Sequence, residues 1–515
     1  MGNRISWLKT AFKTMDEPRL FYRFAAGIVV LALVARLTVF FCFWPTWVWH
    51  TGDVQDDWNK LAINWVAHGT FGFQPGEPTV QRGPIFPLLE IPLYLLFGEN
   101  YAAWSIALLL FDTGTCLLLV LLSRQVWGNR AALLAGQFYS VHLPIIYYCA
   151  TIQQFTSALP LVFLWFYLFS SWDLGSPKKW TPLALGIVSG ALMLNKTVYL
   201  PVTLVSLSGI VWLKRKAPQF KTIRRQASIV LFTAALVVAP WTYRNYVVTE
   251  GALVPVQALF WQIVWQKYVL SDLDATEGAY RPDGETLQYI LSRRAELFDR
   301  VENTSGVKLT GPKRELHDEL VFRDQVLEWF RSRPTQFLNN VTSNIWGFWV
   351  RAENLRKTQL MLSMQVVFLG AALLGFGLTI RYRQLFKIRF GLLLVLTLWA
   401  EYSLVLGWGR FSLDTVPVLA VVFGTGIAEW TKQKVGGNQA IRSLHFRGVG
   451  AGKSIRVQVK ACAHAGHRPL LRDIEGKIRV PIVAGDLADR SGNETLGAVF
   501  VLSVWPGAKE KARKH

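Results

Sequence analysis

Residues 24–44 read FAAGIVVLALVARLTVFFCFW, and the segment at 52–58 that soon follows reads GDVQDDW. Because a helix needs about 20 mostly apolar residues to cross the ~30 Å hydrocarbon core of a bilayer, residues 24–44 are predicted to span a membrane. The segment is too long for a signal peptide and has no small-residue cleavage site, so we expect it to stay as an anchor. Asp53, Asp56 and Asp57 then lie just outside the membrane, where three carboxylates suggest a catalytic site.

The composition agrees with a chain that is mostly membrane. Of its 515 residues, 52% are apolar and 17% are charged, whereas about 25% are charged in an average soluble domain. The 55 basic and 34 acidic residues give a formal charge of +21, which in a soluble protein would point to nucleic acid. In a membrane protein the positive-inside rule accounts for much of this excess, so no nucleic-acid partner is expected.

The hydropathy pattern predicts an all-α polytopic membrane protein with about ten membrane-spanning helices, in a range from eight to twelve. The apolar stretches lie at 24–44, 101–122, 131–149, 155–172, 181–195, 197–213, 227–241, 360–380, 390–407 and 412–430. Three prolines in RGPIFPLLEIPLYLLFG at 82–98 disfavour a straight span there. An interfacial helix is the better interpretation of that segment.

Basic residues mark every second connection between these stretches. They occur at 4–23, 124–130, 178–179, 214–225, 381–389 and after Lys432. The positive-inside rule places all six connections, and with them both termini, in the cytoplasm. Residues 45–100, the turns near 150 and 196, the segment 242–355 and the turn at 407–410 are then extracytoplasmic. We therefore predict a multi-pass protein of the plasma (inner) membrane with an extracytoplasmic active site.

Five parts follow along the chain. They are a cytoplasmic N-terminus at 1–23, a membrane domain at 24–241 that includes the first outer loop 45–100, an extracytoplasmic loop domain at 242–355, C-terminal transmembrane helices at 356–430, and a small basic cytoplasmic tail at 431–515. Helical spacing is expected within the loop domain at 315–331. The tail has strand-like stretches at 454–463, 477–485 and 496–505. Both a small β-containing appendage and a poorly ordered tail on anionic lipid fit it.

Two motifs in the tail imitate binding sites. GVGAGKS at 448–454 resembles a phosphate-binding loop, but the motif requires glycine where Arg447 stands. Cys462, His464 and His467 are possible metal ligands, yet a fourth ligand and a paired motif are missing. We therefore expect neither nucleotide binding nor a metal site in the tail.

Polar and ionisable side chains recur at span ends on the extracytoplasmic face. They are Asp53, Asp56, Asp57, Arg82, Gln153, Gln154, Lys196, Arg244 and Arg410. A charge in lipid is costly unless it faces protein or water, so this set suggests a shared wet cavity. Acid beside base suits transfer from a phosphorylated leaving group, because a carboxylate can take the proton of the attacking group and Arg or Lys can stabilise the departing phosphate.

Four motifs in this order resemble the GT-C superfamily of integral-membrane glycosyltransferases. They are GDVQDDWNKLAINWVAHGTFGF at 52–73, QRGPIFP at 81–87, PWTYRNY at 240–246 and GRFSLDTVP at 409–417. Within the superfamily, the likeness is to the bacterial relatives of protein O-mannosyltransferases and of the aminoarabinose transferase acting on lipid A. It covers roughly residues 20–430.

The resemblance implies an inverting hexosyl- or pentosyltransferase of the cell envelope that moves a sugar from a polyprenyl-phosphate donor. Asp53 matches the family's first-loop aspartate, the proposed general base. Asp57 is the alternative, because this motif has one extra residue. At the positions that match the family's motifs, the resemblance implies that Arg82, Lys196, Arg244 and Arg410 contact the donor and its phosphate.

The resemblance also has a departure at 151–154, where many relatives carry a second acid and this chain reads TIQQ. Gln153 or Gln154 can hydrogen-bond a sugar, but neither amide can act as a base or bind a metal strongly. No metal ligands are therefore assigned, no cofactor is required, and a divalent cation is left open.

Each assignment has a structural alternative. Aspartate is a favoured helix N-cap, and Asp56 fits best the cap of the helix that begins DWNKLAINWVAHG. Arg82 and Arg244 can serve as interfacial anchors. Lys196 is more simply explained by a side chain that snorkels to the interface than by catalysis.

Two other functions compete with sugar transfer. A lipid-linked-sugar transporter or flippase also needs a charged cavity, but should show inverted repeats or broken helices near the bilayer midplane. The sequence has no convincing repeat, and its charges gather at one face. A non-catalytic envelope-assembly subunit would tolerate substitution of the outer acids and arginines. The acceptor, whether lipid, glycan or protein, has no legible motif.

Overall fold

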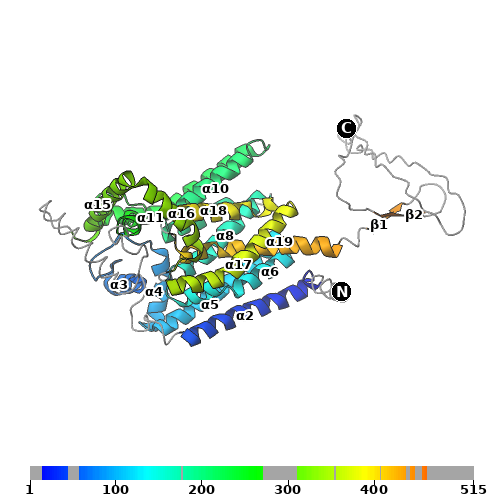
Figure 1. Ribbon diagram of the computed structural model, residues 1–515, viewed down its shortest axis with the longest axis horizontal. Coiled ribbons are helices and arrows are strands. Elements are labelled where there is room, and N and C mark those ends of the chain that lie inside the picture. The colour runs from blue at the N-terminus through cyan, green and yellow to red at the C-terminus, as the bar shows by residue number, and fades with distance from the viewer. Residues whose placement is uncertain are drawn as a thin grey trace, which may run out of the picture. The chain divides into compact units, whose positions relative to one another are not determined.

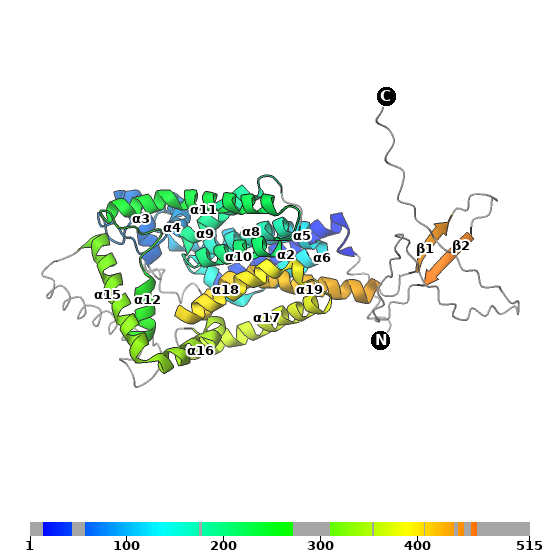
Figure 2. The same cartoon turned by 90° about the horizontal axis from the view of Figure 1, so that it is seen from above.

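The structure is a computed structural model of the chain, and it describes eight stretches of residues. They are 14–43, 57–174, 178–270, 310–352, 355–405, 407–436, 441–446 and 455–460. The chain divides into two compact units, Met1–Val435 and Gly436–His515. The described part of the first unit is built of helices, and that of the second is a pair of strands (Figures 1 and 2).

Six helical spans among the described residues are long and apolar enough to cross a membrane. They are Pro18–Cys42, Tyr101–Trp127, Phe155–Asp173, Phe220–Val248, Thr358–Arg381 and Gly409–Gln433. The elements that contain them are α2 (Pro18–Phe43), α5 (Tyr101–Trp127), α8 (Phe155–Asp173), α11 (Phe220–Val248), α17 (Leu355–Arg381), and η6 (Gly409–Thr415) with α19 (Val416–Gly436). These spans support an integral membrane protein, while the count of about ten stays a prediction.

Two shorter apolar helices explain why one connection lies inside the protein. α9 (Thr181–Asn195) and α10 (Tyr199–Leu213) have 15 residues each. At about 1.5 Å per residue, such a helix is ~22 Å long and cannot cross a ~30 Å core upright. Lys196, the first residue of the turn between them, is buried, and the next two residues are partly buried.

The predicted span at 131–149 is divided into two helices, α6 (Asn129–Ser140) and α7 (Leu143–Ala150). Pro144 lies in the first turn of α7. Backbone N–H groups in the first turn have no partner within the helix, so a proline there costs no helical hydrogen bond. The side chain of His142 caps α7, because its Nδ1 accepts a hydrogen bond from the Ile145 amide at 3.3 Å. The expectation of one continuous helix here was therefore wrong.

The proline-rich segment forms α4 (Ile85–Phe97), with Pro84 at the N-cap position and Pro92 inside the helix. Its approach to α9 requires a glycine. A Cβ on Gly83 would lie 1.9 Å from the Leu194 carbonyl oxygen, so only glycine lets the two backbones touch. This contact fixes residue 82 beside the end of α9. The position of α4 on a membrane surface stays a prediction.

A group of helices from the predicted loop domain lies at the same end of the unit as α3 (Trp58–His68) and α4, at the left in both views (Figures 1 and 2). They are α12 (Phe260–Trp265), the π-helix η4 (Gln266–Leu270), α15 (Gly311–Ser332) and α16 (Pro334–Val350). α15 confirms the helical spacing expected at 315–331. Trp265, Tyr268 and Phe322 lie in the small core of this group.

The main core lies between the long helices and is rich in aromatic side chains. Trp165, Phe166 and Phe169 of α8 are fully buried in it. Small residues let helix backbones approach closely there. A Cβ atom on Gly424 of α19 would lie only 2.3 Å from the Ala131 carbonyl oxygen of α6, so this contact between the two helices requires glycine. The short helix η5 (Leu385–Lys387) leads into α18 (Arg389–Val405), which occupies the predicted span at 390–407.

The second unit contains β1 (Ile441–Phe446) and β2 (Ile455–Lys460), paired antiparallel from Ile441 with Lys460 to Phe446 with Ile455. β2 confirms the strand expected within 454–463. The strands expected at 477–485 and 496–505 lie outside the described residues, as do Cys462 and the two nearby histidines.

Candidate functional site

A buried ion pair joins two segments that are far apart in the sequence. Lys196 follows α9, Asp414 lies in η6, and Lys196 Nζ is 2.8 Å from Asp414 Oδ2. Their side chains are 6% and 0% exposed. Lys196 therefore does not snorkel to an interface, because its side chain is buried and Asp414 supplies a counter-charge inside the protein.

Arg410 joins this pair against one aromatic ring. Lys196 Nζ lies 6.0 Å from the centroid of the Phe411 ring, and the Arg410 guanidinium carbon lies 5.3 Å from it. Arg410 is also close enough to act electrostatically on Lys196. Cations over aromatic faces are stabilised by the ring quadrupole. We call Lys196, Arg410 and Asp414 the outer cluster, after the face on which they were predicted.

A tyrosine lies beside the carboxylate of the outer cluster. The Tyr199 hydroxyl and Asp414 Oδ1 are both buried, and Tyr199 is close enough to Asp414 to donate a hydrogen bond to it. Both residues are completely buried. Buried polar atoms are nearly always paired, and here Lys196 and Tyr199 are the neighbours that pair with Asp414.

The two predicted sugar-binding amides precede α8, beside the cluster. Gln153 is buried, and Gln154 occupies the N-cap position of α8. The next residue, Phe155, has its ring centroid 4.4 Å from Lys196 Nζ. The residue after this link therefore lies close to Lys196, while the cavity shared by the predicted side chains stays a prediction.

Arg82 lies at the same end of the unit but in a separate group of contacts. Its guanidinium carbon is 5.4 Å from the centroid of the Trp58 ring and 5.7 Å from that of Phe73. The Gly83 contact with Leu194 holds this loop on the end of α9. Arg82 therefore stands near the start of α3 and not in the ring contacts of the outer cluster.

Arg244 holds the first loop together. Its guanidinium donates hydrogen bonds to the carbonyl oxygens of Thr79 at 2.6 Å and Phe71 at 3.0 Å. It also lies 4.9 Å from the centroid of the Trp241 ring. These contacts give Arg244 a structural task, because both terminal nitrogens of its guanidinium donate to backbone carbonyl groups of the loop.

Glu315 of α15 completes this brace from the opposite side. Its carboxylate accepts hydrogen bonds from the Thr79 hydroxyl at 2.6 Å and the Val80 amide at 2.7 Å. Burial raises the pKa of Glu315, and the hydrogen bonds from Thr79 and Val80 and the nearby positive charge of Arg82 oppose that rise. The sequence pattern did not identify this residue, since its partners are more than two hundred positions away.

The aspartates of the first loop are described only in part. Asp57 is the N-cap residue of α3, in a left-handed conformation with φ 54°, and its side chain makes no capping hydrogen bond. Its carboxylate instead pairs with Lys60 at 2.8 Å, with both side chains nearly half exposed. Asp57 thus occupies the N-cap position without capping through its side chain, and the expectation that Asp56 caps this helix stays a prediction. Asp53 and Asp56 lie outside the described residues.

Within the described residues, no group of three or more His, Cys, Asp or Glu side chains could hold a metal ion. The predicted first-loop acids Asp53 and Asp56 are not among the residues tested. A divalent cation consequently stays an open prediction.

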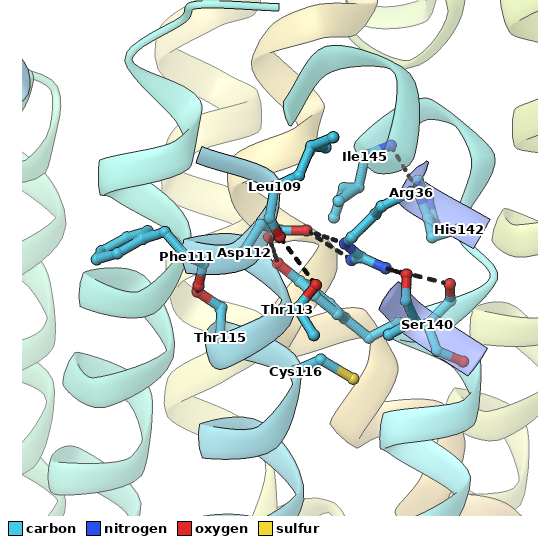
Figure 3. A network of polar contacts seen from close by, with 12 residues as sticks. Arg36, Leu109, Phe111, Asp112, Thr113, Thr115, Cys116, Ser140, His142 and Ile145 are labelled. Atoms are coloured by element: carbon cyan, nitrogen blue, oxygen red, sulfur yellow. Dashed lines mark hydrogen bonds and ion pairs between the residues drawn. The ribbon is translucent and has the colours of Figure 1, made fainter. Parts of the chain in front are cut away.

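A second polar network lies in the middle of the helices and was missed from the sequence (Figure 3). Arg36 of α2 pairs with Asp112 of α5 at 2.6 Å, and both are completely buried. Tyr139 of α6 donates a hydrogen bond to the other carboxylate oxygen. Charges at such positions are costly in lipid and are by default functional candidates. We call these three residues the interior network.

The interior network also touches the break between α6 and α7. Arg36 donates hydrogen bonds to the carbonyl oxygens of Ala32 at 3.0 Å and Ser140 at 3.4 Å. Ser140 is the last residue of α6, so its carbonyl is one that the helix leaves unpaired. The arginine thereby compensates both the aspartate charge and the interrupted backbone.

No protein-family model matches the chain, and no curated protein matches it. Among solved structures it is similar to the archaeal oligosaccharyltransferase AglB from Archaeoglobus fulgidus in complex with an inhibitory peptide and a dolichol-phosphate, at 14% identity and a TM-score of 0.45, over 78% of this chain and 50% of that one. It is also similar to ArnT from Cupriavidus metallidurans bound to undecaprenyl phosphate, at 14% identity and a TM-score of 0.36, over 80% and 78%. The chain thus spans half the length of AglB.

Proposed function

We propose that this chain is a membrane glycosyltransferase that takes a sugar from a polyprenyl-phosphate donor and passes it to a lipid, glycan or protein acceptor on the extracytoplasmic face. The observation that carries the proposal is the outer cluster. Lys196 and Arg410 converge on the Phe411 ring at the end of a bundle of apolar helices. A phosphate carried on a lipid tail needs both features, cations for its oxygens and an apolar surface for its chain.

In the proposed reaction, an acceptor hydroxyl or amine attacks the anomeric carbon of the donor sugar from the face opposite the phosphate. A bond forms from the acceptor atom to that carbon while the bond from the carbon to the phosphate oxygen breaks, which inverts the configuration. The leaving oxygen gains negative charge, which Lys196 and Arg410 stabilise. The acceptor proton passes to a carboxylate.

Asp53 remains the first candidate for that carboxylate, with Asp57 as the alternative. Asp57 is adjacent to Trp58, whose ring contacts Arg82, but its pairing with exposed Lys60 gives it an ordinary surface partner. In this scheme Arg82 lies beside the donor, and Gln153 and Gln154 hydrogen-bond the sugar.

The role of Arg244 is revised from donor binding to support. It holds the loop from Phe71 to Thr79, which leads directly to Arg82. Because Glu315 binds the same loop from α15, the donor side of the site would depend on this brace. A divalent cation is compatible with the scheme but no step is routed through one.

A lipid-linked-sugar transporter is the second candidate, and one observation favours it. Arg36 and Asp112 form a charged pair within the membrane helices, beside a break between α6 and α7. Broken helices with polar groups are typical of transporter sites. In this chain, however, the arginine, aspartate and tyrosine bind one another, which leaves little polar capacity for a cargo. A non-catalytic assembly subunit stays a third alternative.

The test is mass analysis of envelope glycolipids and glycoproteins from cells with and without the gene. We expect one sugar-bearing species to disappear on deletion, to return with the wild-type gene, and to stay absent with Asp53→Asn at equal protein level. Restoration by Asp53→Asn but not by Asp57→Asn would move the base to Asp57. Full restoration by both variants, or accumulation of an unflipped lipid-linked sugar instead of a lost product, contradicts the transferase.

A further inference from the structure

A pocket of about 300 Å³ lies at the ends of three helices. It is lined by the last turn of α5, the last two turns of α8 and the start of α9. Lys196 follows the other end of α9, a helix that is ~22 Å long at about 1.5 Å per residue. The pocket is therefore separate from the outer cluster. Its polar lining residues are Gln125, Tyr167, Ser171, Lys178, Trp180 and Thr181.

The pocket lies where the sequence predicts the cytoplasmic surface of the membrane. α5 and α8 are two of the candidate membrane spans, and the basic residues at 124–130 and 178–179 lie at or just beyond their ends. The positive-inside rule places such residues on the cytoplasmic side. Trp180 is 51% exposed, which is common for a tryptophan at the level of the lipid headgroups. A ligand in this pocket would meet both water and lipid.

The lining is also apolar in part. Val126, Leu168 and Leu174 contribute to the same pocket as the polar residues. A soluble anion gains nothing from an aliphatic surface, whereas an amphiphile gains free energy when its hydrocarbon part covers that surface. The mixed lining therefore favours a ligand with a polar head and an apolar body.

The charge of the lining selects the sign of that head. Lys178 is the one charged residue among the described residues that line the pocket, and its Nζ lies 5.6 Å from the centroid of the Trp180 ring. The neighbouring carboxylate of Asp173 is 1% exposed and is paired with Lys214 and Arg389. An anionic headgroup at the pocket would therefore meet a cation and no acid of the lining.

Two other acids at this end of the helices also have basic partners. Asp16 pairs with Arg130 at 2.6 Å, and Glu429 pairs with Lys387 at 3.2 Å. Neither acid lines the pocket. The attraction of Lys178 for an anion is therefore not opposed by a carboxylate at the pocket wall.

Uncharged hydrogen-bonding groups complete the lining. The Tyr167 hydroxyl donates a hydrogen bond to Gln125 Oε1 at 2.8 Å. With its oxygen engaged, Gln125 offers its NH₂ group as a donor, and the hydroxyl groups of Ser171 and Thr181 can donate or accept. Such groups suit the phosphate and glycerol oxygens of a lipid headgroup.

We propose that this pocket binds the headgroup of an anionic glycerophospholipid. Lys178 binds the phosphate, the amide and hydroxyl groups of the lining bind the headgroup oxygens, and Val126, Leu168 and Leu174 contact the start of the acyl chains. Basic pockets between membrane helices on the cytoplasmic side are used in this way. The inference does not depend on the proposed function, because no residue of the pocket takes part in the proposed reaction.

The experiment counts the lipids that stay on the full-length protein by native mass spectrometry, after release from nanodiscs with equal amounts of phosphatidylglycerol and phosphatidylcholine. The two lipids can share their acyl chains and phosphate, but choline cancels the charge of the second. Wild type should retain one phosphatidylglycerol in preference to phosphatidylcholine. Lys178→Gln should reduce this preference about fivefold. Equal retention of both lipids by wild type, or an unchanged preference in Lys178→Gln, overturns the inference.

The matched control is the next residue in the chain. Lys179 is exposed like Lys178 but does not line the pocket. Lys179→Gln removes the same charge at nearly the same depth, and should leave the preference as it is in wild type. A loss as large as that of Lys178→Gln would mean that lipid is attracted by the basic surface in general, which overturns the pocket assignment.

Two further measurements test the pocket itself. Ser171→Phe places a large side chain at the pocket without a change of charge, and should abolish retention of phosphatidylglycerol. Full retention would place the lipid elsewhere. Inorganic phosphate in the solution should not displace the lipid, and displacement would show that a soluble anion suffices. If Ser171→Phe does not fold, Lys178→Gln decides alone, since Lys178 is exposed on a turn.

Discussion

The interior network and the outer cluster each hold a basic residue against a buried aspartate, but they lie at different places in the helices. In the interior network, Asp112 accepts from Arg36 and Tyr139, and Arg36 also binds the exposed backbone of the α6–α7 break. In the outer cluster, Asp414 is paired with Lys196 and has Tyr199 beside it. The first arrangement joins helices within the bundle, and the second lies at a turn, where a second cation, Arg410, shares the Phe411 ring with Lys196.

The difference teaches how a buried charge can be assigned to stability or to binding. A buried charge whose partners are all internal contributes mainly to holding one arrangement of helices. A buried cation at the end of a helix, with a second cation close by, can instead hold an anionic ligand. The outer cluster lies at a turn and a short 3-10 helix, whereas the interior network lies well inside α2 and α5.

The largest expected effect comes from breaking the interior network. Asp112→Leu leaves the Arg36 charge buried without its carboxylate, which should destabilise the fold by about 3–5 kcal/mol. Thermal unfolding of the purified protein in detergent measures this, along with the yield of folded protein.

The control for that change is the double variant Arg36→Met with Asp112→Leu. Because it removes both charges together, it should regain most of the lost stability. If Asp112→Leu is as stable as the wild type, or the double variant is no better than the single one, the network does not have the structural task assigned to it.

The next effect concerns the outer cluster and should appear in binding more than in stability. Arg410→Gln removes charge-assisted hydrogen bonds to a phosphate, each worth about 1.5–3 kcal/mol, so affinity for polyprenyl phosphate should fall about 10- to 100-fold. Isothermal titration in nanodiscs measures it. Arg124→Gln, at a site where Arg124 lies 4.5 Å from the Phe21 ring centroid, is the matched control and should bind normally. Equal binding by Arg410→Gln would reassign Arg410 to anchoring.

A smaller effect is expected where the first loop is braced. Arg244→Gln removes two hydrogen bonds to loop carbonyl groups, which should loosen residues 71–80 by about 1–3 kcal/mol. Hydrogen exchange of that segment should speed up, with the long helices unaffected. Unaltered exchange together with lost donor binding would return Arg244 to the phosphate site and contradict the structural assignment.

A pH effect of modest size is expected from Lys267 in η4. Burial, with a contribution from the nearby positive charge of Arg351, lowers the pKa of Lys267 from 10.5 to about 8. Between these values the unfolded chain binds more protons than the folded one, so stability should rise with pH from about 8 to 10.5. In Lys267→Met, the melting temperature should no longer rise with pH over this range. A slope that persists in the variant assigns the effect to another group.

The smallest effect is expected from the tail. Deletion of residues 440–515 removes most of the second compact unit and should leave polyprenyl-phosphate binding and sugar transfer in vitro unchanged, because every assigned residue precedes it. Loss of turnover in a folded, truncated protein would give the tail a task in the reaction.

Much of the helical architecture could be predicted from composition. The stretches at 155–172 and 181–195 nearly coincide with α8 and α9, because apolar runs bounded by polar residues have few other solutions. The break at 141–142 was missed, although the proline at position 144 was a usable signal for a helix start. A hydropathy average over the whole stretch does not register a single proline of this kind.

The sequence predicted some residues of the site but not which of these residues contact one another. Lys196 and Arg410 were both singled out, but Asp414 was not, since 218 positions separate it from Lys196 and no local pattern links them. The interior network was legible in principle, because Arg36 and Asp112 stand inside apolar spans. Which charge meets which depends on helix packing, and a single sequence does not encode that in any local spacing.

The most direct test of the central claim is photo-crosslinking with a polyprenyl phosphate that carries a photoreactive group next to the phosphate. The account predicts that label concentrates on peptides containing residues 194–199 and 408–415, and that unlabelled polyprenyl phosphate displaces it. Label confined to the lipid-facing surfaces of α2 and α17, or label that the unlabelled lipid does not displace, would contradict a lipid-phosphate site at Lys196 and Arg410.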